Sequence, residues 1–152
     1  MAKFIFKLQS LLNVKMQMED NLKNELGKAT QKLENEKERL RQIENERIEC
    51  INQVSGESSR GIMVGKLKEY SAFISFLKEK AELQKENINY AQNVVDKYRE
   101  QLIKVVQEKE MLEKLKEKKF KEYLKEQFKE EQKINDEITS YKYNKTLGEQ
   151  NG

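Results

Sequence analysis

The residues whose spacing most resembles a chemical site lie in one short stretch, GESSRGIMVGKL, which begins at Gly56. Gly56 and Gly61 have the four-residue gap of a phosphate-binding loop, and the pair Gly65-Lys66 follows. Such a loop needs Lys and then Ser or Thr directly after its second glycine, because the lysine binds phosphate oxygens and the hydroxyl holds magnesium. Two apolar residues follow Gly61 instead, and the preceding sequence predicts no strand. We therefore interpret this stretch as a turn.

The residue types of the chain do not indicate any other catalytic site or a metal site. The chain has no histidine, which is the commonest general base and metal ligand. Its carboxylates alternate with lysines as on exposed helix faces, so nothing desolvates a pair of them into an acid/base site. Cys50 is the single cysteine, which excludes an internal disulfide and fits a reducing compartment. We expect a non-enzymatic protein without cofactor or metal.

The composition indicates long helices. Charged residues make up 38% of the 152 residues and apolar residues 36%, against about 25% and about 45–50% in ordinary domains. The chain has no proline, and the good helix formers Glu, Lys, Gln and Leu dominate. The net charge of +3 comes from mixed signs, which argues against nucleic-acid binding. No apolar run approaches the roughly 18 residues that span a bilayer, so we expect no direct membrane insertion.

Two segments of the chain carry the 3.5-residue spacing of a left-handed coiled-coil seam. In the first segment, eight of ten seam positions are apolar: Leu22, Leu26, Ala29, Leu33, Glu36, Leu40, Ile43, Arg47, Cys50 and Val54. We expect Cys50 to be a small buried residue of this seam. The second segment has one polar exception, Gln84, among Leu67, Tyr70, Ile74, Leu77, Ala81, Gln84, Ile88, Ala91, Val95, Tyr98, Leu102 and Val105.

The stretch SGESSRG between the seams favours an all-α fold, a long antiparallel two-helix coiled-coil hairpin. We predict one coiled-coil domain over 1–152, with helix one at about 5–54, a turn at 55–61, helix two at about 62–143 and a frayed tail at 144–152. A turn centred near residue 58 places residue i opposite residue 116 − i. The start of helix one then lies opposite about residue 108 of helix two. The second seam loses its apolar residues at the same point. The alternative is one straight helix that dimerises.

Two groups of apolar residues lie off the seams and are candidate partner surfaces. Near the turn, Ile48, Ile51, Phe73 and Phe76 fall at heptad positions outside the seam, and aromatic residues commonly anchor interfaces. Further on, helix two overhangs its partner from about 109 to 143. A row of Phe120, Leu124 and Phe128 lies there on one helical face, and we expect nothing in this chain to cover it. Self-association is the alternative explanation for that row.

The order of three motifs resembles the family of the flagellar export protein FliJ. The opening FIFKLQSLLNVK resembles the family's aromatic-basic start followed by Leu-Gln-x-Leu-Leu. EYSAFISFL, which begins at Glu69, resembles the start of its second helix. EKEMLEKLKEKKFKEYLKEQFKEEQKINDEI resembles its C-terminal helix. The resemblance covers nearly the whole chain.

The resemblance implies a non-enzymatic stalk similar to the central stalk of rotary ATP synthases. It would work in the cytoplasm, at the cytoplasmic face of the inner membrane in the flagellar base. It implies three partners: the FliI-like export ATPase, the cytoplasmic domain of the FlhA-like export gate, and export chaperones that it escorts. Ile48, Ile51, Phe73 and Phe76 would bind the gate. The ATPase ring would contact Phe4, Phe6, Leu8, Leu11, Phe120, Leu124 and Phe128. Two alternatives are a stalk protein of a virulence-type type III secretion system and a dimeric coiled-coil tether.

Overall fold

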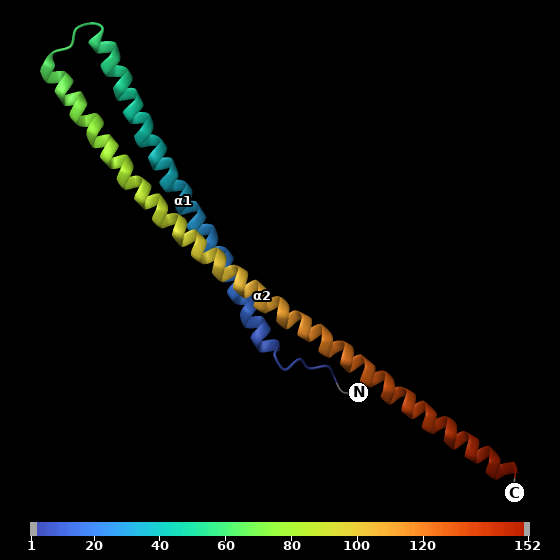
Figure 1. The fold of residues 1–152 in the computed structure, drawn as a ribbon. Helices are drawn as coiled ribbons and strands as arrows, with labels where there is room; N and C mark the ends of the chain where they lie inside the picture. The colour runs from blue at the N-terminus through green and yellow to red at the C-terminus, as the bar shows by residue number, and fades with distance from the viewer. Residues whose placement is uncertain (1–2, 151–152) are drawn as a thin grey trace. The chain divides into compact units, whose positions relative to one another are not determined.

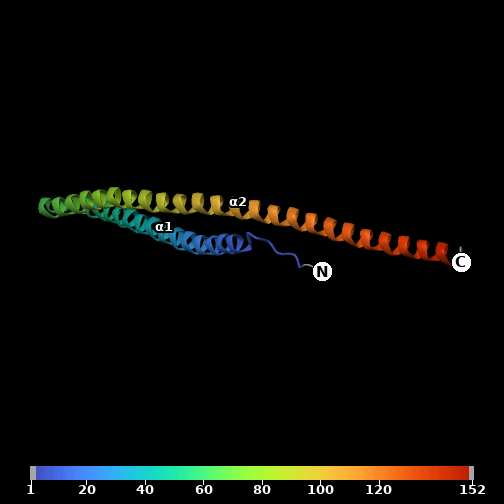
Figure 2. The ribbon, with the colours of Figure 1, turned by 90° about the horizontal axis from the view of Figure 1, so that it is seen from below.

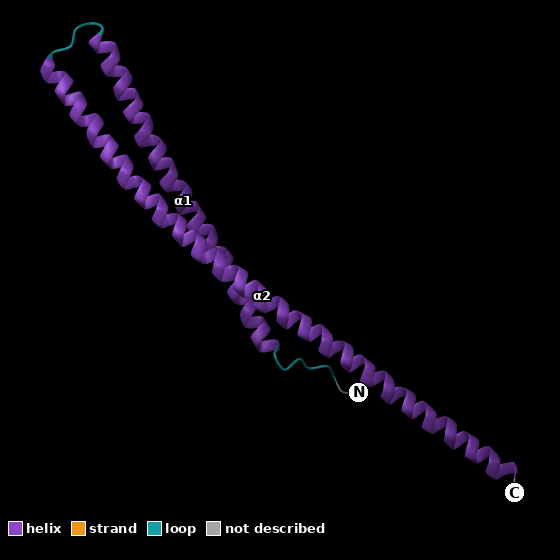
Figure 3. Cartoon of the chain, viewed as in Figure 1, coloured by secondary structure: helices purple, strands orange, loops and turns teal. Residues whose placement is uncertain are grey.

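The computed structural model describes residues 3–150, which form two long helices (Figures 1 and 3). Helix α1 is Gln9–Ser58, helix α2 is Val64–Gln150, and residues 59–63 connect them. No strand occurs in this described range. The all-α prediction is therefore confirmed. Contacts divide the described residues into two compact units: Met18–Val105 forms the hairpin unit, and residues 3–17 with residues 106–150 form the terminal unit.

The hairpin unit consists of two antiparallel helices that lie side by side in both perpendicular views (Figures 1 and 2). Ala29 and Leu33 of α1 pack with Ala91 and Val95 of α2. Nearer the turn, Ile43 of α1 packs with Leu77 and Ala81 of α2. The hairpin within one chain is the predicted fold, and these clusters confirm it.

The burial pattern follows the predicted seams closely. All ten seam positions from Leu22 to Val54 are buried or half-buried, and so are the positions from Tyr70 to Val105. Cys50 is buried, as predicted. Leu67 is the exception, because it remains 40% exposed near the start of α2. The heptad spacing therefore identifies the packed stripe of each helix correctly.

A hydrogen-bonded pair, the buried Gln84 and the half-buried Glu36, crosses the hairpin and favours one alignment of its helices. Gln84 is 6% exposed, and its side-chain amide donates a hydrogen bond of 2.8 Å to the backbone carbonyl of Glu36. The same amide nitrogen also donates to the Glu36 carboxylate. A buried amide without a partner would cost about 1–3 kcal/mol. Alignments that separate Gln84 from Glu36 are therefore disfavoured.

The predicted axial alignment of the two helices is wrong by about one helical turn. The pair Glu36 and Gln84 and the contact between Ile43 and Leu77 both correspond to residue i opposite 120 − i, instead of 116 − i. The cause is the position of the turn. The expected turn at 55–61 is shifted to 59–63, so Gly56 and two of the serines belong to α1.

Gly61 enables the chain to leave α1. Its φ angle is +85°, in the left-handed region that glycine enters without a steric penalty. The amide of Gly61 donates to the carbonyl of Ser58, and the amide of Arg60 donates to the carbonyl of Glu57. These bonds satisfy carbonyls that the end of a helix leaves without partners.

We expect Gly61→Ala and Gly27→Ala to change stability in opposite directions. Alanine at Gly61 would be held at φ +85°, which costs about 1–2 kcal/mol. Gly27 lies inside α1 with no atom within 4 Å of an added Cβ, so alanine there should stabilise by about 0.5–1 kcal/mol. Urea denaturation followed by circular dichroism measures both. A Gly61→Ala variant as stable as the unsubstituted chain would contradict this account of the turn.

The terminal unit combines an extended segment, the first turns of α1 and the last part of α2. Helix one begins at Gln9 instead of about residue 5, because residues 3–6 are not helical. Phe6 and Leu12 are buried, and Lys15 forms an ion pair of 2.5 Å with Glu108. The predicted end of helix two at 143 is also too early, since α2 continues to Gln150. Residues 151 and 152 of the tail expected to fray lie outside the described residues.

Candidate protein-binding surfaces

The turn-end surface consists of Ile48, Ile51, Phe73 and Phe76, as the sequence suggested, and all four side chains are exposed. Phe76 is 55% exposed, and its ring stacks with that of Phe73 at a centroid distance of 6.4 Å. The alignment through Glu36 and Gln84 places Ile48 at about the level of Phe73. Exposed aromatic rings beside aliphatic side chains are typical of interface anchors. This arrangement suits the binding of another protein.

Further apolar side chains beside the turn are exposed, and the heptad pattern does not single them out as a surface. Met63 and Val64 are 81% and 69% exposed, and Leu67 is 40% exposed. The sequence places Met63 and Val64 at the start of helix two and predicts a seam position for Leu67. Their position just after Gly61 is the sequence signal for this exposure, because a helix start next to a tight turn has few neighbours to pack against.

A cluster of three polar side chains links the two helices beside the turn. The hydroxyl of Tyr70 donates to the Glu57 carboxylate at 3.1 Å, and Lys66 lies 3.6 Å from the same carboxylate. Partial burial, together with the negative acceptor Glu57, raises the pKa of Tyr70 above its usual value of 10.0. Tyr70 therefore remains protonated and acts as the hydrogen-bond donor at neutral pH.

The apolar row of the terminal unit is Phe120, Leu124 and Phe128, and these side chains are 42%, 50% and 66% exposed. The row follows on from the α2 seam in successive steps of four residues, from the half-buried Leu112 and Lys116 to Phe120, Leu124 and Phe128. Repeated steps of four exceed the 3.5-residue spacing of a coiled-coil seam, so the row turns gradually around α2. The same stripe continues through Ile134, Ile138 and Tyr141, which are all exposed.

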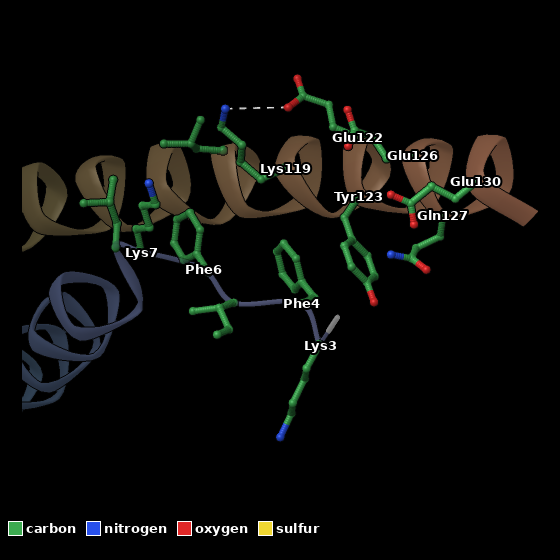
Figure 4. Close-up of a pocket in the computed structure, with 13 residues that line it drawn as sticks. Lys3, Phe4, Phe6, Lys7, Lys119, Glu122, Tyr123, Glu126, Gln127 and Glu130 are labelled. Atoms are coloured by element: carbon green, nitrogen blue, oxygen red, sulfur yellow. Dashed lines mark ion pairs between the residues drawn. The ribbon is translucent and has the colours of Figure 1, made fainter. Parts of the chain in front are cut away.

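Contrary to expectation, part of this apolar row is covered by the chain itself. Residues 3–8, which we name the N-terminal strap, run along α2 (Figure 4). The Phe4 ring lies 5.2 Å from that of Phe120 and 5.5 Å from that of Tyr123, measured between centroids. An extended strand advances about 3.3 Å per residue, against about 1.5 Å in a helix. The strap therefore reaches further along α2 than the predicted helix would.

The residues that the resemblance assigns to the ATPase therefore differ in their exposure to solvent. Phe6 is buried and Phe4 half-buried, whereas Leu8 and Leu11 are about as exposed as Phe120. The strap and α2 border a groove of about 740 Å³, lined on the α2 side by Leu115, Lys119, Glu122, Tyr123, Glu126, Gln127 and Glu130. Figure 4 shows the labelled Phe4 ring close to Tyr123, and Lys119 paired with Glu122. The lining of the groove combines apolar side chains, such as Phe6 and Leu115, with charged ones, such as Glu126.

Neither metal chemistry nor a membrane span is indicated in the described part of the chain. Among residues 3–150, no group of three or more Cys, Asp or Glu side chains is placed to hold a metal ion. Within the same range, neither helix is long and apolar enough to cross a membrane.

Comparisons with known proteins agree with this architecture. The family model described as "Flagellar FliJ protein" matches residues 4–148. The solved structure of CT670 from Chlamydia trachomatis, a protein proposed to be a YscO homolog, superimposes with a TM-score of 0.69. The two chains are 26% identical, and the alignment covers 99% of this chain and 100% of the other. A comparison with curated protein sequences gives no match.

Proposed function

Because the chain belongs to the FliJ family, whose members are stalk proteins of type III export, we propose that it couples the export ATPase to the export gate. The observation that supports this most is the pairing of a coiled-coil hairpin with two separate exposed apolar surfaces. In this proposal the chain is not an enzyme. It works at the cytoplasmic face of the inner membrane and also escorts export chaperones.

The terminal unit is proposed to bind the ATPase ring. Its exposed row of Phe120, Leu124 and Phe128 forms one helical face, and Leu8 and Leu11 add exposed apolar side chains from α1. Titrating this chain into a purified FliI-like ATPase tests the proposal. We expect ATP hydrolysis to rise at low molar ratio. An unchanged rate, with the chain folded and helical by circular dichroism, would contradict the proposal.

The turn-end surface is proposed to bind the cytoplasmic domain of an FlhA-like gate protein. Phe76→Asp should leave the hairpin folded, because the ring is more than half exposed. It should weaken gate binding by about 2 kcal/mol or more, roughly thirtyfold, as expected for an aromatic anchor. Isothermal titration calorimetry measures the affinity.

A matched control is Tyr90→Asp, which changes another exposed aromatic residue of α2 in the same hairpin unit. Tyr90 lies outside the turn-end surface, so this variant should bind the gate like the unsubstituted chain. Equal loss of affinity in both variants would point to a general charge effect and remove Phe76 from the proposed contact.

The similarity to the chlamydial protein favours one second candidate, a stalk protein of a virulence-type type III secretion system. The two candidates share an architecture and differ in the apparatus that they serve. Expression of the chain in a bacterium that lacks its own flagellar stalk protein separates them. Restored swimming supports the flagellar candidate, and restored secretion only in a strain lacking the virulence stalk supports the other.

A further inference from the structure

The N-terminal strap packs on α2 with alternate side chains. Phe6 is buried and Phe4 half-buried against α2, whereas Ile5 is 79% exposed and Lys7 is exposed. This period of two is that of an extended strand. The contacts of the Phe4 ring with Phe120 and Tyr123 anchor the outer part of the strap, and the buried Phe6 anchors its inner part.

The start of α1 lacks the local signals that usually begin a helix. The amide of Leu12 donates to the carbonyl of Leu8 at 2.9 Å, so Leu8 occupies the N-cap position. Leucine is a poor N-cap because its side chain offers no acceptor for the free amides of the first turn. The first turn also has no acidic residue, and Lys7 lies beside the positive end of the helix dipole. The packing of the strap on α2, and not a capping residue, therefore sets the start of α1 at Gln9.

The same residues are able to continue α1 as a helix. The strap contains neither proline nor glycine. Counting back along the seam from the buried Leu12, in steps of four and three, gives Leu8 and Ile5. Both are apolar and both are exposed in the strapped form. The segment therefore carries two apolar sets, Phe4 with Phe6 for the extended form and Ile5 with Leu8 for a helical form.

We propose that the N-terminal strap is a removable cover of the apolar row on α2. In the closed form, Phe4 and Phe6 lie on α2. In the open form, residues 5–8 extend α1 and leave Phe120 and Tyr123 uncovered. The partner of the apolar row must then compete with the strap of the same chain. This inference rests on the proposed function in one respect, which is that the competing partner is the export ATPase.

The test compares a closed strap with an open one in the same full-length chain. Phe4→Cys and Tyr123→Cys are combined with Cys50→Ser, so that the new pair supplies the only two thiols. One sample is joined with a short bis-maleimide. The matched control is the same protein with each thiol capped separately by N-ethylmaleimide. The two samples differ only in the tether.

Two measurements are made on both samples. Carbon-13 Cα chemical shifts report whether residues 5–8 are helical, and a titration gives the affinity for the purified export ATPase. We expect extended shifts in the tethered sample and helical shifts in the capped sample. The tethered sample should bind the ATPase at least about tenfold more weakly, because the binding-competent form is removed.

The two measurements distinguish a failure of the strap proposal from a failure of the proposed function. Residues 5–8 that remain non-helical in the capped sample would overturn the open form. Equal ATPase affinity of the two samples would overturn the covering role. If neither sample nor the unsubstituted chain binds the ATPase, the proposed function fails, and the chemical shifts alone decide whether the strap opens.

Discussion

Val95→Asp is expected to unfold the hairpin unit. The Val95 side chain is completely buried, and it packs with Ala29 and Leu33 of α1. An aspartate there loses the hydration of its carboxylate and gains no cation, and the packing of the valine is lost as well. The expected loss is above about 4 kcal/mol, which is comparable with the whole stability of a small domain, about 5–15 kcal/mol.

Asn93→Asp provides the control for this substitution. Asn93 is exposed two residues before Val95, so the same carboxylate stays in water and should change stability by less than about 0.5 kcal/mol. Urea denaturation followed by far-ultraviolet circular dichroism compares the two variants. Similar unfolding midpoints for the two variants would mean that the seam around Val95 does not hold the hairpin together.

The double variant Leu124→Asp with Phe128→Asp is expected to abolish stimulation of the export ATPase and to leave the fold intact. Both side chains are at least half exposed, so the substitution removes little internal packing. Neither lies in the part of the row that the Phe4 ring covers. Two carboxylates in the centre of an apolar interface would weaken binding by about hundredfold or more.

Ser140→Asp serves as the control here, because it adds a carboxylate to an exposed position of α2 on the side away from the row. Hydrolysis rates are measured over a range of concentrations of each variant. Stimulation by the double variant at the concentration that suffices for the unsubstituted chain would show that Leu124 and Phe128 are not the contact. Loss in the Ser140→Asp variant as well would show that charge alone interferes.

The heptad spacing predicts the packed stripes of this fold but not their axial alignment. Leu33 and Val95 are buried at their predicted seam positions, because each position in a heptad faces one direction whatever its partner is. Sliding one helix by a turn preserves both apolar stripes. Only a specific pair, here the buried amide of Gln84 with Glu36, distinguishes one alignment from the next, and such a pair has no periodic signature.

The conformations of the turn and of the strap also depend on contacts that the local sequence does not reveal. Gly56 and Gly61 look alike in sequence, yet only Gly61 has a positive φ angle and Gly56 remains in α1. The strap is only six residues long, and its Ile5 and Leu8 also fit a helical continuation of the α1 seam. Its extended form depends on contacts with α2 residues more than 100 positions away in sequence, such as Phe120. Local sequence patterns do not encode those contacts.

The five-residue connection between α1 and α2 also determines the order in which the molecule assembles. Contacts beside the turn, such as that of Tyr70 with Glu57, close a short loop, whereas the pair of Lys15 with Glu108 closes most of the chain. Loop-closure entropy therefore favours zippering from the turn toward the termini. Opening is expected to run in the reverse direction, so the strap end exchanges its amide hydrogens first. A partner that engages the termini meets the part of the molecule that opens at the lowest free-energy cost.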